Sequence, residues 1–474
     1  MHPTSRKKLI MKESRRRNVW KMCLTWKLLK SAVFVVCVTY FSWQSANFFQ
    51  LYFAYPTRTN TVRTFPEVLI KPAVTICNTN PVKREVFCEK YPHLCQKPNN
   101  LTEFCNKHPY FCKDNVSNLV IPQLRYYTNH STYNLPDALM EIYTHDITED
   151  GAGYWSWKNP DRDTVNSKMK TIFLYDYLRV VYITCYSSNL QIYGSEDVET
   201  THFDDELVMS HNRLNAYYTS IREEEAFFPW RVPRILLSIH SPFVPINSFD
   251  EGVVLEKNHV YIVNMRMEEE HLLQSPYQTD CKDYEDLWKK NNKTGPRSQE
   301  MCKEWCLWNY YTSCGNCFQG LTMVEKPHRF CTQNSCTSNA KIRVNLKKCR
   351  MNCKVNCKNL IYRYEIIDQL IGPYSTNQHL SFSDEIKISV IIKSPEVIVT
   401  SHKPVYTTLD AFSYIGGLMG CWLGLSVWAC TGIAETTFLT ILRFLKLCMK
   451  KSRHSAPVRN LVLFKRNDHS VPVM

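Results

Sequence analysis

The sequence predicts an α+β membrane protein in which two transmembrane helices flank a large, disulfide-rich extracellular domain with a β-sheet core. The first observation is a pair of uncharged apolar runs, 25 residues from Ser31 to Tyr55 and 24 from Ala411 to Ala434. About 20 such residues cross a bilayer as a helix. The second is that 16 of the 21 cysteines and all four Asn-x-Ser/Thr sequons lie between these runs, as expected outside the cell. We expect glycans at the four sequons, which are Asn100, Asn115, Asn129 and Asn292.

The formal charge of +14 is concentrated at the two ends of the chain. Residues 1–30 carry ten Lys or Arg and one acid, and residues 443–474 carry eight and one. Basic residues beside a span stay on the cytoplasmic side, so we expect a multi-pass plasma-membrane protein with both termini in the cytoplasm. The basic ends would contact membrane lipid, and no nucleic-acid partner is expected. A cleaved signal peptide is the alternative for the first run, but its apolar core would span only about 7 to 15 residues.

These features divide the chain into an N-terminus (1–30), a first span (31–55), an extracellular domain (56–405), a second span (406–442) and a tail (443–474). Segments rich in Val, Ile, Tyr and Phe predict strands at 171–193, 231–247, 252–267 and 386–400. Residues 77–150 are punctuated by Pro and Cys, with short helices predicted at Leu101–Lys107 and Pro136–Tyr143. We expect no internal repeat.

Ten cysteines lie between residues 281 and 357. Cys302 and Cys306 are four residues apart, and so are Cys349, Cys353 and Cys357, a spacing that puts each series on one face of either a helix or a strand. If the two faces meet in antiparallel order, 302 pairs with 353 and 306 with 349, although spacing alone leaves other connectivities open. The segment 314–317 has the Cys-x-x-Cys spacing of a zinc knuckle, but an oxidising compartment favours disulfides, so no metal is expected.

Several motifs resemble the degenerin/epithelial sodium channels, a family that includes the acid-sensing ion channels. After the first span come "LYFAYP" and "KPAVTICNTNP", followed by "CYSSN" at Cys185 and "IHSP" at Ile239. The stretch "CKVNCKNLIYRYEI" is similar to the end of the family's cysteine-rich thumb. The most specific match is "SYIGGLMGCWLGLSVW", which resembles the family's pore helix. The resemblance extends from about Ser31 to Glu435.

The resemblance implies a trimer of identical or related subunits, each with two spans and a hand-shaped ectodomain of palm, β-ball, finger, thumb and knuckle. It implies a sodium-selective, amiloride-sensitive channel gated by an extracellular ligand, by the matrix or by mechanical force. Sodium is the permeant ion, and no cofactor is expected. The implied disulfides are Cys77–Cys185, Cys281–Cys357, Cys302–Cys353, Cys306–Cys349, Cys314–Cys336 and Cys317–Cys331. The even set left over in the finger, Cys88, Cys95, Cys105 and Cys112, is expected to pair locally.

By the same resemblance Gly424, Leu425 and Ser426 are the selectivity filter, and Ser413 is the position at which a small residue permits closure. Five of the 13 glycines lie within residues 416–432. Either Gly416, Gly420 and Gly424, spaced by four, let helices approach closely, or glycine lets backbone carbonyls face a water-filled path, which Gly417 would also line. The resemblance favours the path, with Tyr414 near its outer end. Both explanations can hold together.

Three further features have two interpretations each. Glu435 is either a cation attractor at the pore mouth or an acid snorkelling near the cytoplasmic end. Tyr55 and Tyr277 stand where the family couples thumb to first span, or they pack as ordinary interfacial tyrosines. Gln44, Asn47 and Gln50 form a polar stripe on the first span that we expect to pack against the second helix.

Some positions depart from the family pattern. The His-Gly dipeptide before the first span is missing, Tyr414 and Leu418 replace polar residues of the outer pore, and the family's acid falls at Gly432 rather than Glu435. Acidic runs at 223–225 and 268–270 could sense protons, but Pro56 and Thr57 replace histidines of acid-sensing members, so the stimulus stays open. No HExxH, GxSxG or phosphate-loop motif is present, so no enzyme is expected. The alternatives are an ATP-gated type of trimeric cation channel and a non-conducting, membrane-tethered adhesion or receptor subunit.

Overall fold

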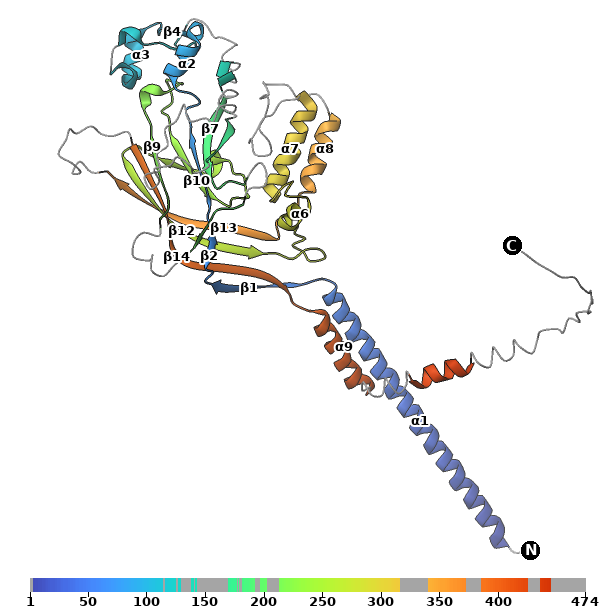
Figure 1. The fold of residues 1–474 in the computed structure, drawn as a ribbon. Coiled ribbons are helices and arrows are strands. Elements are labelled where there is room, and N and C mark those ends of the chain that lie inside the picture. The colour runs from blue at the N-terminus through green and yellow to red at the C-terminus, as the bar shows by residue number, and fades with distance from the viewer. Residues whose placement is uncertain are drawn as a thin grey trace, which may run out of the picture. The chain divides into compact units, whose positions relative to one another are not determined.

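The structure is a computed structural model that describes residues 3–113, 116–124, 127–128, 138–139, 141–142, 169–176, 178, 181–191, 197–202, 213–315, 340–371, 385–424 and 435–444. These residues form two compact units. The helical unit consists of Met1–Pro56 with Pro404–Met474, and the sheet unit is Thr57–Lys403. The mixture of helices and sheets agrees with the predicted α+β class (Figure 1).

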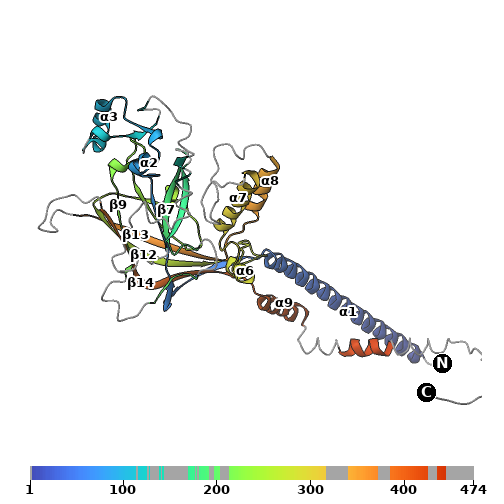
Figure 2. The ribbon, with the colours of Figure 1, turned by 45° about the horizontal axis from the view of Figure 1, so that its top comes forward.

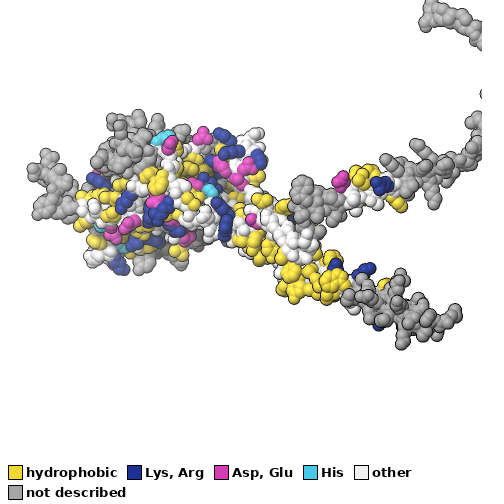
Figure 3. All heavy atoms as spheres, turned by 90° about the horizontal axis from the view of Figure 1, so that it is seen from below, with side chains coloured by type: hydrophobic (Ala, Val, Ile, Leu, Met, Phe, Trp, Pro, Cys, Tyr) yellow, Lys and Arg dark blue, Asp and Glu magenta, His cyan; other side chains and the backbone are white. Residues whose placement is uncertain are grey.

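The helical unit contains α1 (Pro3–Tyr52) and α9 (Thr408–Leu423). In the part of the chain that the structure describes, one helical stretch is long and apolar enough to span a membrane, Leu24–Tyr52, with 29 residues and a mean hydropathy of 1.4. It covers most of the first predicted span. Figure 3 shows hydrophobic side chains gathered along this unit, as expected for helices that face lipid.

The second predicted span is not one continuous helix among the described residues. Helix α9 begins at a capping box in which Thr407 and Asp410 bind each other's backbone N–H groups, and it ends at Leu423. Gly424 then takes the left-handed conformation, with φ 63° and ψ 20°. Because an α-helix rises 1.5 Å per residue, the 16 residues of α9 cover about 24 Å, less than the hydrocarbon core. Residues 435–444 are helical, and residues 425–434 lie outside the described residues.

The sheet unit is built on two five-stranded sheets. The first contains β1 (Thr57–Thr64), β9 (Arg213–Ser220), β12 (His259–His271), β13 (Lys358–Leu370) and β14 (Glu385–Pro404). The second has the order β11-β10-β3-β7-β6, with strands Val253–Leu255, Ile235–His240, Ala73–Asn78, Val181–Ser188 and Lys170–Asp176. Two small sheets pair β2 (Val68–Ile70) with β8 (Thr200–His202) and β4 (Cys95–Gln96) with β5 (Ile121–Pro122).

The largest apolar cluster joins the two large sheets. Strand β14 contributes Ile386, Ile388, Val390 and Ile392, each at most 3% exposed, while the residues between them lie less deeply buried. This is the two-residue period of a strand with one face on the core. Strands β3 and β10 supply the opposite wall through residues such as Ile76 and Leu237.

The predicted strand segments contain β6 and β7, β10, β11 with most of β12, and β14. Strands β1, β3, β9 and β13 were not predicted as strands. Strand β1 is polar and almost wholly exposed at the edge of its sheet, so it lacks the apolar alternation on which the prediction depends. All six residues of β3 are buried because β7 and β10 pair with it on both edges.

Helices α6 (Tyr284–Lys290), α7 (Gln299–Gly315) and α8 (Ala340–Met351) form the cysteine-rich part. Helices α7 and α8 lie side by side in both views (Figure 1, Figure 2). Cys306–Cys349 joins the two helices, and Cys302–Cys353 joins α7 to the segment just after α8, which is the antiparallel pairing that the spacing suggested. The short helix α5 (Ser248–Glu251) follows β10.

The finger part contains an internal repeat, so the expectation of none is wrong. Helix α2 (Arg84–Lys90) leads into the 3-10 helix η1 (Pro92–Leu94), and α3 (Leu101–Lys107) leads into η2 (Pro109–Cys112). The sequences "FCEKYPHLC" and "FCNKHPYFC" begin at residues 87 and 104, and each is closed by a local disulfide, Cys88–Cys95 or Cys105–Cys112. The residues that end the two helices have nearly the same backbone angles, φ −126° and ψ 66° against φ −131° and ψ 65°.

Helix α3 has the bounds that the sequence predicts, because the Asn100 side chain accepts a hydrogen bond from the Glu103 N–H and caps it. Of the second predicted helix, residues 138, 139, 141 and 142 are helical. Two further 3-10 helices among the described residues are η3 (Val116–Asn118) and η5 (Glu223–Glu225).

Candidate functional site

The predicted pore residues lie in the helical unit, where α1 and α9 pack together through aromatic side chains. Phe48 of α1 is 6% exposed. Its ring stacks on Tyr414 of α9 with centroids 4.2 Å apart and meets the edge of Tyr406 at 5.5 Å. Tyr414 therefore packs against α1 in this subunit, although the resemblance places it at the outer pore.

A second contact between these helices lies two turns further along α9. The Trp422 Nε1–H donates a hydrogen bond of 2.8 Å to Oε1 of Gln44. The Trp422 ring stacks on Tyr40 with centroids 5.3 Å apart and an interplanar angle of 12°. Trp422 and Leu423 also wall an apolar groove of about 350 Å³ against α1. The sequence predicted that Gln44 packs against the second helix, but it did not identify Trp422 as the partner, because nothing in either helix alone does so.

Helix α9 has two faces with different environments. Ala411, Ile415, Leu418, Met419 and Trp422 are partly buried, and their spacing marks the side that meets α1. The predicted pore residues Ser413, Gly416, Gly417 and Gly420 are exposed on the rest of the helix.

A Cβ atom placed on Gly416 or Gly417 would meet nothing within 4 Å. These glycines therefore do not serve close packing of α1 on α9 within one subunit. This face of α9 is open among the described residues.

The predicted filter begins where α9 stops. Gly424 ends the helix in a left-handed conformation that residues with a side chain rarely adopt, and its N–H donates to the carbonyl of Met419. A Cβ there would meet no atom within 4 Å, so the constraint is conformational rather than steric crowding. Leu425, Ser426 and Gly432 lie outside the described residues. Glu435 is exposed and lies in the helical residues 435–444.

The polar stripe on α1 does not pack as one surface. Gln44 is partly buried and contacts α9, whereas Asn47 and Gln50 are exposed in the subunit. The expectation holds only for Gln44. The reason is geometric: an α-helix turns 100° per residue, so residues three apart drift by about 60° per step.

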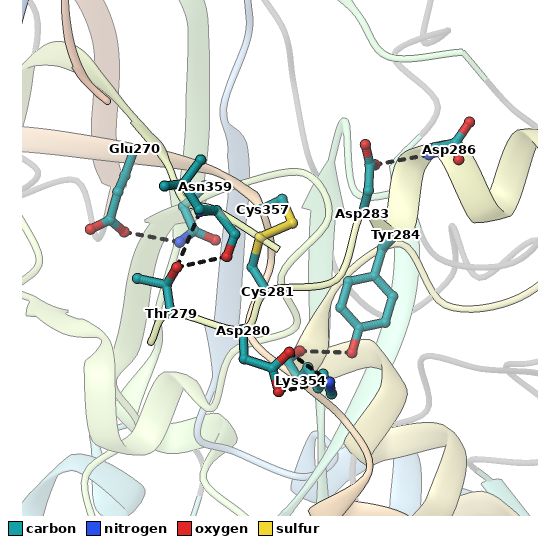
Figure 4. Close-up of a disulfide and its surroundings, with 11 residues drawn as sticks. Glu270, Thr279, Asp280, Cys281, Asp283, Tyr284, Asp286, Lys354, Cys357 and Asn359 are labelled. Carbon is teal, nitrogen blue, oxygen red and sulfur yellow. Dashed lines mark hydrogen bonds and ion pairs between the residues drawn. A yellow bond between two sulfur atoms is a disulfide. The ribbon is translucent and has the colours of Figure 1, made fainter. Parts of the chain in front are cut away.

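The base of the cysteine-rich part is fixed to β12 and β13 by a disulfide and several hydrogen bonds (Figure 4). Cys281 is joined to Cys357, and the N–H of Leu272 donates to the Cys357 carbonyl at 2.8 Å. Lys354 forms an ion pair of 2.7 Å with Asp280, and its carbonyl accepts from the Tyr284 hydroxyl. Burial raises the pKa of Tyr284 to about 12, so this hydroxyl keeps its proton.

Tyr277 lies on the loop that precedes this disulfide. The Thr279 hydroxyl accepts from the Leu273 N–H at 3.1 Å and donates to the Leu273 carbonyl at 2.6 Å, which closes the loop. Tyr55 belongs to the other unit and stands at the end of α1 with φ 49°. Its ring lies 6.4 Å from Tyr52 and 6.3 Å from Phe53.

Four disulfides that the resemblance implies are formed, at Cys77–Cys185, Cys281–Cys357, Cys302–Cys353 and Cys306–Cys349. The implied pairs Cys314–Cys336 and Cys317–Cys331 lie outside the described residues or involve side chains that are not described. Among the predicted glycan acceptors, Asn100 and Asn292 are exposed. Asn115 and Asn129 lie outside the described residues.

The two acidic runs are largely ion-paired. Lys257 and Lys83 bind Glu223 and Glu225 at 2.9 and 3.1 Å. Arg363 and Lys358 bind Glu268 and Glu269 at 3.3 and 3.1 Å. These contacts favour structural roles for both runs.

Sequence patterns also missed a buried cation in the sheet unit. Arg297 is 8% exposed and forms a two-pronged ion pair with Glu285 at 2.9 to 3.1 Å. Its guanidinium lies between the rings of Trp288, at 3.9 Å, and Phe243, at 4.3 Å. The contact ties the α6–α7 segment to the turn after β10.

Comparison with known proteins gives a match that includes the sheet unit, α9 and most of α1. A family model described as amiloride-sensitive sodium channel matches residues 9–435. Comparison with curated proteins found no match. Among solved structures 41 chains match. One, titled "Cryo-EM structure of a proton-activated chloride channel", has 5% identity over 88% of this chain and 98% of that chain, with a TM-score of 0.27. A similarity this low carries no argument about fold or function.

Proposed function

This chain belongs to the amiloride-sensitive sodium channel family, and on that premise we propose that it is one of three subunits around a sodium-selective, amiloride-sensitive pore. Members of this family are membrane ion channels that assemble from several subunits. The proposal places α9 at the pore and Gly424, Leu425 and Ser426 at the filter.

The observation that carries the proposal is the end of α9 at Gly424. The helix stops there in a left-handed turn, and the glycine face that leads to it is not covered by α1. Irregular backbone at membrane depth is tolerated where it lines a water-filled cavity or is buried in protein. Three such breaks around an axis would present a ring of main-chain carbonyls that replaces part of the hydration shell of a small cation.

Further residues have supporting roles in this proposal. Glu435 would raise the local cation concentration at the inner mouth of the pore. The loop that carries Tyr277 is fixed to the base of the cysteine-rich part, so movement of that part would move the tyrosine with it. We propose Tyr277 and Tyr55 as the route by which the ectodomain gates the pore.

The test is whole-cell recording from the full chain and its Ser413→Phe variant, with surface delivery measured by biotinylation. Ser413 is exposed on the glycine face, so a phenyl group there would obstruct closure of the pore. We expect a constitutive inward current at least tenfold above background that is lost on sodium replacement and blocked by amiloride. Ser413→Ala, which stays small, is the control and should leave the pore closed. Absence of current from Ser413→Phe at normal surface density would contradict the proposal and favour a non-conducting subunit.

A further inference from the structure

Trp422 is the penultimate residue of α9 and stands two residues before Gly424. It has two partners on α1, the Gln44 side-chain oxygen at 2.8 Å and the stacked Tyr40 ring at 5.3 Å. Tyr40 and Gln44 are four residues apart, so they lie on one face of α1, where one contacts the face of the indole ring and the other its N–H. We call these three residues the indole clamp.

The indole clamp lies at the end of α9 that leads into the break. Near the middle of the helix Phe48 stacks on Tyr414, eight residues before Trp422. Between them are Gly416, Gly417 and Gly420, which have no side chain to contact α1. Ile415, Leu418 and Met419 are partly buried on the side that meets α1, and the indole clamp adds a hydrogen bond and a ring stack to this contact two residues before Gly424.

The N–H of the indole has a special requirement in this setting. A polar group without a partner at membrane depth is strongly unfavourable, so the hydrogen bond to Gln44 has few alternatives. The stack on Tyr40 orients the plane of the indole ring, and the hydrogen bond to Gln44 orients its N–H. Together the two contacts restrict the position and orientation of the last turn of α9, and therefore of the Gly424 backbone that follows it.

We propose that Tyr40 and Gln44 of α1 are positioning residues for the selectivity filter, acting through Trp422. The inference rests on the proposed function and adds residues of the first span to the determinants of ion selectivity. None of the three side chains needs to touch the ion. If the contacts of the indole clamp are removed in each subunit, the Gly424 carbonyl oxygens vary more in position. The filter then discriminates less between sodium and potassium.

The experiment measures reversal potentials under bi-ionic sodium and potassium conditions in the conducting Ser413→Phe parent. Trp422→Phe keeps an aromatic ring for Tyr40 and removes the N–H, and Gln44→Met keeps the side-chain length and removes the acceptor. We expect each to lower the sodium-to-potassium permeability ratio at least threefold. At 59 mV per tenfold change for a single charge, this is a shift of about 28 mV. Asn47→Leu, an exposed polar residue on the same helix, is the matched control and should leave the ratio unchanged.

The double variant Gln44→Met with Trp422→Phe tests the mechanism directly. Because neither partner is left with an unpaired polar group, the double variant should be delivered to the surface even where a single variant is retained. Its permeability ratio should equal that of the single variants, since all three lack the same hydrogen bond. Unchanged ratios in conducting single or double variants would overturn the inference and leave the proposed function intact. A parent that reaches the surface and carries no sodium current would instead refute the proposed function.

Discussion

Acidification should destabilise the sheet unit through His240, a residue at the end of β10. The side chain is 7% exposed. Its Nδ1–H donates to the Ser241 carbonyl at 2.9 Å, so Nε2 is the acceptor for the Thr75 hydroxyl at 2.8 Å. Thr75 in turn lies 2.7 Å from the hydroxyl of Ser187. The neutral ring fits this chain of hydrogen bonds, and a proton on Nε2 would force the hydroxyls to reorient.

Burial lowers the pKa of His240 from 6.5 to about 4. The unfolded chain therefore binds a proton between pH 6.5 and about 4 that the folded chain does not bind, and stability falls as the pH is lowered through this window. Each pKa unit corresponds to 1.36 kcal/mol, so the full loss is about 3 kcal/mol. Above pH 6.5 the residue contributes no pH dependence.

The assay is thermal unfolding of the full-length protein in detergent at pH 7, 5.5 and 4, compared with His240→Gln. The substituted side chain stays neutral at every pH, so the variant should start less stable at pH 7 and lose several degrees less on acidification. Other titrating groups affect both proteins alike and cancel in the comparison. Equal losses of Tm in the two proteins between pH 6.5 and 4 would refute the assignment of a buried, neutral His240.

Three further outcomes are expected in the same unfolding assay. Arg297→Lys should lower the free energy of unfolding by about 2 kcal/mol, because an ammonium group cannot form a two-pronged ion pair or stack as a planar group. Arg297→Met should lower it less, since methionine leaves no buried charge. A larger loss for Met than for Lys would contradict this account. Phe87→Ala and Phe104→Ala remove fully buried rings at equivalent positions of the finger repeat, so each should cost about 3 to 5 kcal/mol, and a cost below about 1 kcal/mol in either would argue against equivalence. Asn100→Gln should abolish the glycan and the cap of α3. Its free energy of unfolding should be about 1 kcal/mol lower than that of Thr102→Ala, which removes only the glycan signal. Equal stabilities of the two variants would disprove the cap.

Local chemistry determined the features that the sequence predicts well. Helix α3 has the predicted bounds because Asn100 caps it within one turn. The alternation in β14 identifies its buried face without knowledge of its neighbours, because side chains of a strand alternate between faces. The four-residue spacing of the cysteines pairs α7 with α8 and with the segment just after it, once the two helices are antiparallel. The finger repeat was also readable, in "FCEKYPHLC" and "FCNKHPYFC", but it was missed.

The sequence by itself determined the first apolar span, the oxidised cysteine framework and the family, because composition, spacing and motif are properties of the chain alone. Only the tertiary structure decided that Gln44 meets Trp422, that Arg297 lies between two rings, and that the glycine face of α9 is turned away from α1. Each of these arrangements depends on side chains that are far apart in sequence. The free energy that stabilises each arrangement comes from packing between these side chains and not from local backbone preferences. A glycine in a sequence permits a left-handed turn, but the surrounding packing selects which glycine adopts it.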